Sequence, residues 1–584
     1  MIKGLYQIGK IYDVKIVDSF VEEIEGNKKY IIEINFDTVE KEISLSSREY
    51  SKGDEYEYNF IKMGLTGRQN QIFVVFADVK RIYGDGKSHS IWISLKNEIE
   101  DGELKEKISQ VEKIFYENYK LKEEYKKSIE DYLNKININN KKIAFWVVKV
   151  DNEYIHNNES YLNLIEKKVL EEKAEKGKII CHLCSKETEE FYTDFSRLKM
   201  KIYINDKVGF SQNISNNWEG NFALCEDCYK ILIRGQSFVL NKFNLKVGSI
   251  DYLIIPEFIK EPKLSKDNLE RWSKHVKFYK NPFEFFKNEF EENIKNYIEF
   301  KEDDNFVLLN YLFYEKNNQQ FKVFGLIKDI PNGRIEKLRE EFKKNINEFR
   351  AFFEDGSYII KNLSDIYYLI PLRISDNKIV DIQKIMNLFF AIFNENVVDI
   401  DNLIYDFTLG FRAIYYENSA YHLSKYFKNK NDEIKYILKT HQLLKFLKGG
   451  ESDMNLDMLL DMLEEVYKNY IKTCYFDEKE TSLFLLGIVI GKIGSIQYTS
   501  YKYKPILEKV NFSGMNKEKL IILYNEVLEK MKQLEIYGNY EVIYSLSKQL
   551  FDKNLKNWNL KSYENTYYIL SGYAFETYRI LKGG

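Results

Sequence analysis

Four of the five cysteines in this chain are spaced for binding a metal ion. Cys181 and Cys184 form one Cys-x-x-Cys pair, and Cys225 and Cys228 form a second pair further along the chain. A two-residue gap lets both thiolates of a pair bind the same ion. Four thiolates complete the tetrahedral shell that Zn²⁺ prefers in structural sites, and no position stays open for catalysis. The spacing therefore predicts one structural zinc site.

A pair of redox dithiols and a coincidental spacing are the alternatives to zinc. A redox Cys-x-x-Cys usually lies at the start of a helix in a βαβ unit, and the surrounding sequence shows no such pattern. His182, inside the first pair, offers a further ligand, but four thiolates already fill the shell. Cys474 lies alone in an amphipathic helical pattern and is expected to be a small core residue. This cysteine usage suits a reducing compartment.

Motifs for catalysis are missing from the sequence. The stretch 487–495, GIVIGKIGS, lacks the spacing of a phosphate-binding loop, and we expect a helix whose small residues allow close packing. The six histidines are scattered and form no metal-ligand or nucleophile pattern. We therefore expect no enzymatic activity. A zinc-stabilised nuclease with an unrecognised acidic site is the alternative, because catalytic groups can be far apart in sequence.

The elements that must position the cysteines indicate an α+β, multidomain fold. We expect a mixed N-terminal region with an inserted Cys₄ zinc-ribbon-like module, and an all-α bundle at the C-terminal end. The expected domains are an α+β domain at 1–176, the zinc-binding module at 177–245, a central α+β to helical region at 246–452 and a helical bundle at 453–584. The length of 584 residues suits three or four domains.

Hydrophobic periodicity predicts the individual elements. Strands are expected at 28–36, 71–79, 143–150, 252–258, 307–315 and 319–327, and a small sheet formed by 199–206 and 207–210 between the cysteine pairs. Helices are expected at 103–135, 158–175 and 266–298, and from 334 onward with an extended interruption at 357–374. The C-terminal helices are expected at 455–475, 479–497, 515–534, 538–556 and 560–581.

The charge and hydropathy exclude some classes of protein. The chain has 87 basic and 90 acidic residues, so it lacks the basic excess of a free-standing nucleic-acid binder. Contact with nucleic acid would come from local patches or from partner subunits. No uninterrupted apolar run is long enough to span a membrane, and the first residues do not resemble a secretory signal. We expect a soluble, cytoplasmic protein.

The cysteine region also resembles a known family. The runs that carry the resemblance are CHLC, YTDFSRLKMKIYINDKVGF and NFALCEDCYKILIRG, with Tyr203, Asp206, Lys207, Gly209 and Phe210 between the two cysteine pairs and Gly235 after them. They resemble the zinc region of the large subunit of type I-B CRISPR complexes, CRISPR-associated protein eight, subtype b, of the Csh/TM group. Residues 308–338, 484–497 and 562–573 also resemble this family.

The resemblance implies a subunit of Cascade, the crRNA-guided surveillance complex. It implies roles in recognising the protospacer-adjacent motif, in supporting the R-loop and in recruiting the effector helicase-nuclease. The implied partners are the other Cascade subunits with crRNA, the target double-stranded DNA with its displaced single strand, and that helicase-nuclease, with no membrane. A zinc-ribbon scaffold without nucleic-acid contact is a further alternative.

Basic residues are the candidates for contact with DNA phosphates. The candidates are Lys207 and Arg234 beside the cysteine pairs, Lys62, Arg68, Arg81 and Lys87 in turns of the N-terminal region, and Lys502, Lys504 and Lys509 in the C-terminal bundle. Gly64 and Gly67 would let backbone amides approach a duplex closely. For each of these positions the alternative is an ordinary solvated surface charge.

Some members of this family make a separate small subunit by internal translation, and Met454 is the candidate start here. The codons of Lys448 to Glu451 can encode a ribosome-binding sequence shortly before it. The product would comprise residues 454–584. Gly449 and Gly450 also suit a helix stop followed by a linker, and both interpretations can hold together.

Overall fold

The computed structural model describes most of the chain and divides it into two compact units. The described residues are 1–21, 24, 26–61, 72–83, 91–136, 140–170, 174–195, 197–200, 219–259, 264–271, 273, 307–317, 320–376, 378–429, 431–448, 456, 459–474 and 476–583. Unit 1 comprises Met1–Asn244, Leu253–Ser273 and Tyr314–Val323, and unit 2 comprises Leu245–Tyr252, Lys274–Phe313 and Phe324–Gly584. The fold is α+β and multidomain, as predicted. The division into four domains stays a prediction.

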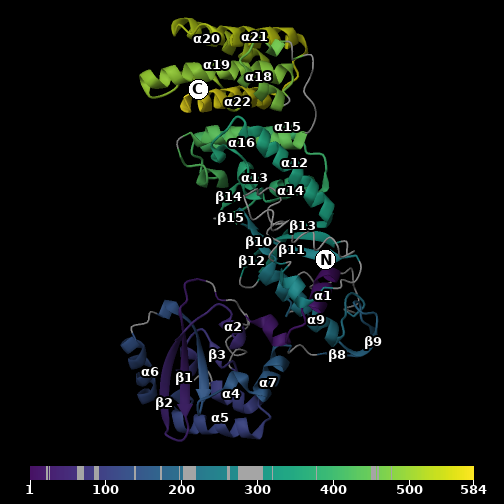
Figure 1. Ribbon diagram of the computed structural model, residues 1–584, viewed down its shortest axis with the longest axis vertical. Coiled ribbons are helices and arrows are strands. Elements are labelled where there is room, and N and C mark those ends of the chain that lie inside the picture. The colour runs from purple at the N-terminus through teal and green to yellow at the C-terminus, as the bar shows by residue number, and fades with distance from the viewer. Residues whose placement is uncertain are drawn as a thin grey trace. The chain divides into compact units, whose positions relative to one another are not determined.

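The first sheet of unit 1 has the strand order β2-β1-β6-β3, with β7 paired to β6. Figure 1 labels β1, β2 and β3 of this sheet. Its strands are β1 (Tyr30–Asp37), β2 (Glu42–Glu49), β3 (Val75–Phe76), β6 (Ile143–Val150) and β7 (Glu153–Tyr154). β1 and β6 run parallel and are mostly buried; β6 is a nearly continuous apolar run, whereas β1 also buries Glu33 and Asn35. The predictions at 28–36 and 143–150 are confirmed. The run at 71–79 is buried at Ile72–Phe76, but only two of its residues form a strand.

The remaining elements of unit 1 are mainly helices. They are α1 (Ile2–Ile11), α2 (Asp54–Glu57), α3 (Lys80–Tyr83), α4 (Ile91–Glu98), α5 (Gly102–Phe115), α6 (Glu123–Ile136), α7 (Glu159–Val169) and α9 (Glu226–Lys242), with two hairpins, β4 (Tyr116–Glu117) with β5 (Lys120–Leu121), and β8 (Glu175–Ile180) with β9 (Glu187–Phe191). Phe36 on β1 joins the sheet to α4 and α5, since its ring lies 5.0 Å from that of Trp92 and 5.1 Å from that of Phe115.

The single helix predicted at 103–135 is wrong. The chain forms α5 and α6 with the β4–β5 hairpin between them. Asn118 and Tyr119 have φ values of 47° and 67°, which are the two positive values of a tight hairpin turn. Ile108, Val111 and Phe115 are buried on one side of α5, but Tyr119, in the turn of the hairpin, is 51% exposed. The helix predicted at 158–175 likewise ends early, at Val169, because β8 begins at Glu175.

A second sheet has the order β10-β11-β12-β13. Its strands are β10 (Asn244–Val247), β11 (Ile250–Phe258), β12 (Val307–Asn317) and β13 (Gln320–Pro331). The strands predicted at 252–258, 307–315 and 319–327 are confirmed. Of the helix predicted at 266–298, only residues 266–271 and 273 are described, and they are helical.

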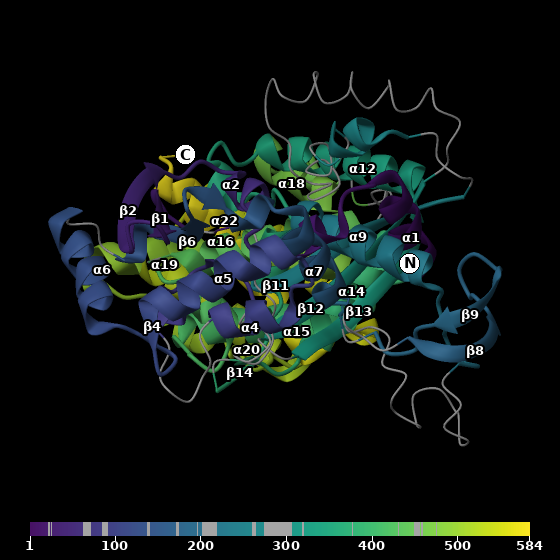
Figure 2. The ribbon, with the colours of Figure 1, turned by 90° about the horizontal axis from the view of Figure 1, so that it is seen from below.

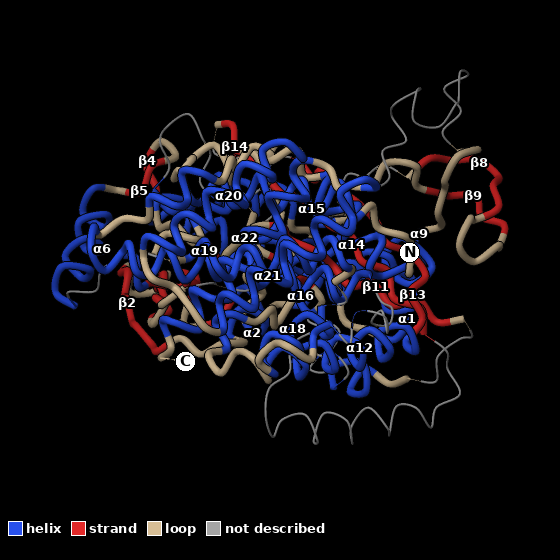
Figure 3. Tube along the Cα trace, turned by 90° about the horizontal axis from the view of Figure 1, so that it is seen from above, coloured by secondary structure: helices blue, strands red, loops and turns tan. Residues whose placement is uncertain are grey.

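Unit 2 continues with helices, which Figure 3 draws in blue. They are α12 (Asn332–Arg350), α13 (Leu363–Leu369), α14 (Gln383–Asn394), α15 (Ile400–Tyr415), α16 (Asp432–Lys448), α18 (Glu465–Cys474), α19 (Glu478–Tyr501), α20 (Lys517–Gln533), α21 (Asn539–Asn554) and α22 (Ser562–Leu581), with one hairpin of β14 (Ile374–Ser375) and β15 (Lys378–Ile379). The predicted C-terminal helices agree with α18–α22, although the first is interrupted, since Leu456, Leu459 and Leu460 are helical, 461–464 are not, and α18 begins at Glu465. Part of the predicted interruption at 357–374 is helical, since Asn362 caps α13 by accepting from the Asp365 amide.

Helices α19 and α22 cross at close range in the core of unit 2. A Cβ added to Gly487 would lie 2.0 Å from the Ile569 carbonyl oxygen, and one added to Gly572 would lie 1.8 Å from that of Phe484. The small residues of this stretch therefore allow close packing, as predicted. α19 is also long and apolar enough to cross a membrane, but 78% of that apolar window is buried inside the protein. Its hydrophobicity is explained by its place in the core.

Candidate metal centre

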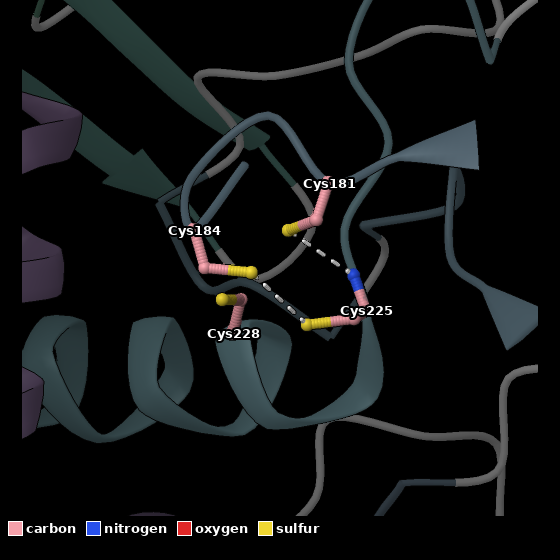
Figure 4. A group of neighbouring side chains, drawn as sticks. All are labelled: Cys181, Cys184, Cys225 and Cys228. Atoms are coloured by element: carbon pink, nitrogen blue, oxygen red, sulfur yellow. Dashed lines mark hydrogen bonds between the residues drawn. The ribbon is translucent and has the colours of Figure 1, made fainter. Parts of the chain in front are cut away.

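The four predicted cysteines come together in unit 1 (Figure 4). The sulfur atoms of Cys181, Cys184, Cys225 and Cys228 all lie within 4.8 Å of one another. The Sγ atoms of Cys184 and Cys225 are 3.9 Å apart. In a tetrahedral site with Zn–S bonds of 2.3 Å, the sulfur atoms are about 3.8 Å apart. The cluster could therefore hold one metal ion with small shifts of the side chains.

The β8–β9 hairpin holds the first pair of cysteines. The two strands run side by side (Figure 2), and the turn between them contains Cys181 and Cys184. The Cys181 amide donates to the Lys186 carbonyl at 2.9 Å, and the Ser185 amide donates to the Cys181 carbonyl at 2.9 Å. Ser185 has a φ of 58°, which turns the chain tightly after Cys184. The thiol groups of Cys181 and Cys184 consequently point toward a common position, where one ion could bind.

Helix α9 holds the second pair. Cys225 is its N-cap residue and Cys228 lies in its first turn. Three backbone hydrogen bonds join the start of this helix to the hairpin region. Tyr192 and Leu224 exchange hydrogen bonds of 2.8 and 3.1 Å, and the His182 amide donates to the Ala223 carbonyl at 3.1 Å. The backbone therefore aligns the two pairs.

His182 is placed for backbone contact rather than for metal binding. Its Nδ1 accepts a hydrogen bond from the Ala223 amide at 3.1 Å. The cluster of potential ligand atoms contains the four cysteines only. Cys474, on α18, is buried and separate from this cluster, as its helical pattern predicts.

The surroundings of the thiols determine how readily each one releases its proton to a metal ion. Burial raises the pKa of Cys228 and of Cys225, so neutral thiols are preferred there without a positive charge. Burial also acts on Cys181, but hydrogen bonds from backbone amides, including those of Cys184 and Cys225, lower its pKa to about 7. A metal ion stabilises thiolates and releases their protons. The donor set thus fits a thiophilic divalent ion.

One residue of this region has no signal in the sequence. The hydroxyl group of Tyr6, on α1, lies 3.4 Å from the Cys228 Sγ. The two residues are far apart along the chain, and tyrosine is not a typical zinc ligand. Only the packing of α1 against α9 brings them together.

The basic candidates for DNA contact differ in their surroundings. Arg234, on α9, pairs with Asp13 at 2.7 Å. Burial lowers the pKa of Arg81, on α3. Lys502 is exposed at the end of α19. The Nζ of Lys504 donates to the Tyr573 hydroxyl at 2.7 Å.

Of the remaining candidates, Lys509 is the one that the structure describes. It pairs with Glu526 at 2.9 Å. Lys62, Arg68, Lys87, Lys207 and Met454 lie outside the described residues, as do Gly64, Gly67 and most of the sheet predicted at 199–210. Within the described part of the chain, the four cysteines form the one group of three or more cysteine, histidine or acidic residues that could hold a metal.

Comparison with known proteins places the chain in a family. Residues 178–330 match the central domain of CRISPR-associated protein TM1802, and residues 361–584 match its C-terminal domain. No curated protein matches the chain. The two family matches cover more than half of the chain, and the central match contains all four cysteines. The chain therefore belongs to the CRISPR-associated protein TM1802 family.

Proposed function

We propose that this chain is the large subunit of a crRNA-guided type I-B surveillance complex, Cascade, that acts in antiviral defence in the cytoplasm. In this role it contributes to recognition of the protospacer-adjacent motif, to R-loop stabilisation and to recruitment of the effector helicase-nuclease. The observation that supports the proposal is the pair of family matches over the central and C-terminal domains. Base pairing with the guide supplies sequence specificity in such complexes, which suits a chain with a net charge of −3.

The metal that we propose for the cysteine cluster is a structural Zn²⁺. Four thiolates form a closed shell, so the ion would have no position for substrate or activated water. It would join the β8–β9 hairpin to the start of α9 and add to the backbone hydrogen bonds that already connect these elements. Cys181 and Cys184 would supply two bonds from the hairpin, and Cys225 and Cys228 two from the helix.

Contacts with DNA would come from exposed basic side chains. Lys502 is the best placed of the described candidates, because its side chain is exposed. Arg234 would have to exchange its ion pair with Asp13 for a phosphate contact, and both side chains reach solvent. Such contacts would position the DNA without reading its sequence.

A separate small subunit starting at Met454 is part of the proposal. The contacts of α22 set a condition for the stability of such a product. In the full chain α22 is joined to α16, because the Thr440 hydroxyl lies 2.9 Å from that of Tyr567, and His441 contacts Ser571. A product of residues 454–584 would lack α16. It would therefore need another partner for this face of α22.

A nuclease is the alternative, and one experiment separates it from the proposal. Target duplex DNA is incubated in Mg²⁺ or Mn²⁺ with Cascade that contains this chain, with Cascade that lacks it, and with the purified chain alone. The proposal predicts that the chain increases binding of DNA with the correct adjacent motif and leaves the DNA intact. Cleavage by the purified chain that is lost on changing one carboxylate would favour the nuclease. Equal binding with and without the chain would contradict the proposed role.

A further inference from the structure

The N-terminal helix α1 contacts the helix that carries the second cysteine pair at backbone distance. A Cβ added to Gly9 on α1 would lie 1.9 Å from the Ile231 carbonyl oxygen of α9. A Cβ added to Gly235 on α9 would lie 1.8 Å from the Leu5 carbonyl oxygen of α1. Neither position has room for a side chain, so the two backbones touch at this crossing. This close crossing determines which residues of α9 the neighbouring residues of α1 can contact.

Tyr6 is the residue of α1 that reaches the cysteine cluster. It follows Leu5 directly, and its hydroxyl lies 3.4 Å from the Cys228 Sγ, which is within the range for a hydrogen bond to sulfur. Cys228 stands about two turns before Gly235 on α9. The glycine crossing and the Tyr6 contact are therefore neighbouring parts of one helix–helix interface.

A second set of contacts holds α1 independently of the sulfur. The Gln7 side chain donates to the Phe258 carbonyl at 2.9 Å and accepts from the Phe258 amide at 3.0 Å. Gly4 approaches β11 so closely that a Cβ there would lie 2.4 Å from the Pro256 carbonyl oxygen. Since α1 is held on two sides, the Tyr6 hydroxyl is already in place before any metal binds.

We propose that Tyr6 is a positioning residue of the metal centre and donates a hydrogen bond to the metal-bound Cys228 thiolate; this rests on the proposed zinc site. A metal-bound thiolate carries no proton, so Tyr6 must be the donor once the ion is present. Outer groups of this kind orient a ligand and adjust its electron donation to the metal. Helix α1 thus contributes a hydrogen-bond donor to a metal site whose ligands all lie much later in the chain.

The test compares full-length wild type with Tyr6→Phe, which keeps the ring and removes the donor. Zn²⁺ release to a chelator is followed, and the sulfur-to-metal charge-transfer bands are recorded after Co²⁺ replaces Zn²⁺. Loss of an outer-shell partner typically weakens metal binding by about 10–100-fold. We expect Tyr6→Phe to release Zn²⁺ at least several-fold faster and to shift the Co²⁺ bands. Such a shift would not follow from a merely structural role of the ring.

Tyr12→Phe is the matched control. It removes a hydroxyl group at the end of the same helix, where the ring packs on Phe238 at 4.8 Å. This variant should behave like the wild type. If the wild type binds one metal ion and Tyr6→Phe gives the same release rate and bands, the role of Tyr6 is wrong and the zinc site stands. If the wild type binds no metal, the zinc site is wrong and the role of Tyr6 falls with it. Equal effects of both variants would also overturn the inference.

Discussion

Gly9 and Gly235 meet where α1 crosses α9, and a Cβ on Gly235 would lie 2.9 Å from the Gly9 amide nitrogen. The crossing therefore tolerates no side chain on either helix. It joins the first helix of the chain to the helix that carries two of the four cysteines, so it connects the stability of this region to the metal centre.

Replacing Gly235 with alanine should separate the two helices. Overpacking of a tight contact typically costs about 1–3 kcal/mol, and the neighbouring atoms here are backbone, which cannot move aside easily. Hydrogen exchange should become faster in Ile2–Ile11 and Glu226–Lys242. Gly102→Ala is the matched control, because nothing lies within 4 Å of its added Cβ at the start of α5. Unchanged exchange in Gly235→Ala would contradict the close crossing.

Replacing Cys225 with serine should abolish stable metal binding. The thiolate is one of four in the shell, and three remaining ligands hold zinc much less tightly. Zinc per chain, measured by mass spectrometry, should fall from about one toward zero. Residues 175–195 should then lose protection against proteases. Cys474→Ser is the control, because Cys474 is buried on another helix and should not change the zinc content. Full zinc content in Cys225→Ser would refute the assignment.

Acid should destabilise unit 2 through its buried histidines. Burial lowers the pKa of His441 from 6.5 to about 3 and that of His422 to about 4. Between these values and 6.5 the unfolded chain binds protons that the folded chain does not. The free energy of unfolding is therefore highest above pH 6.5 and falls as the pH decreases, by about 1.4 kcal/mol for each pH unit and histidine.

The variant His441→Gln should reduce this pH dependence. It removes one titrating group, although it also loses the hydrogen bond between His441 Nδ1 and the Tyr470 hydroxyl at 2.7 Å. The absolute stability should be lower, and its slope between pH 4 and 6.5 smaller. Urea unfolding at several pH values, with hydrogen exchange in α16 and α22 as the probe, measures the absolute stability and its slope with pH. An identical slope in the variant would show that His441 does not cause the effect.

Two neighbouring lysines should have different effects when they are replaced. Lys504 contacts Tyr573 through its ammonium group, which also lies 4.8 Å from the ring centre. Lys504→Met should therefore lower stability by about 1 kcal/mol. Lys502 is exposed and has a φ of 61°, a conformation that asparagine tolerates. Lys502→Asn should leave stability unchanged and weaken DNA binding by the assembled complex, with a smaller salt dependence. No change in DNA affinity would remove Lys502 from the proposed interface.

The sequence predicts those features that depend on local spacing. The two Cys-x-x-Cys pairs indicate their convergence, since few arrangements other than a metal site use four such thiols. The apolar runs of β6 and α19 likewise indicate their positions closely. The small residues of α19 indicate close packing, and the structure identifies α22 as the neighbour through Gly487 and Gly572.

Other features depend on contacts between distant segments and were not predictable. The break after Phe115 requires two positive φ values at Asn118 and Tyr119, and nothing in the apolar pattern excludes a continuous helix there. Tyr6 approaches Cys228 only because the tertiary fold places α1 on α9. Lys504 has the same residue type as Lys502, and only its contact with Tyr573 separates their expected roles.

Purification of the intact assembly would show whether this chain is a subunit of a crRNA-guided complex. The chain is tagged and isolated from cells that contain its CRISPR locus, and the bound RNA is sequenced while the bound proteins are identified. We expect CRISPR RNA and further CRISPR-associated subunits in a constant ratio to the chain, and an assembly that binds duplex DNA matching the guide. If the chain purifies alone, with neither CRISPR RNA nor other CRISPR-associated proteins, it is not a subunit of such a complex.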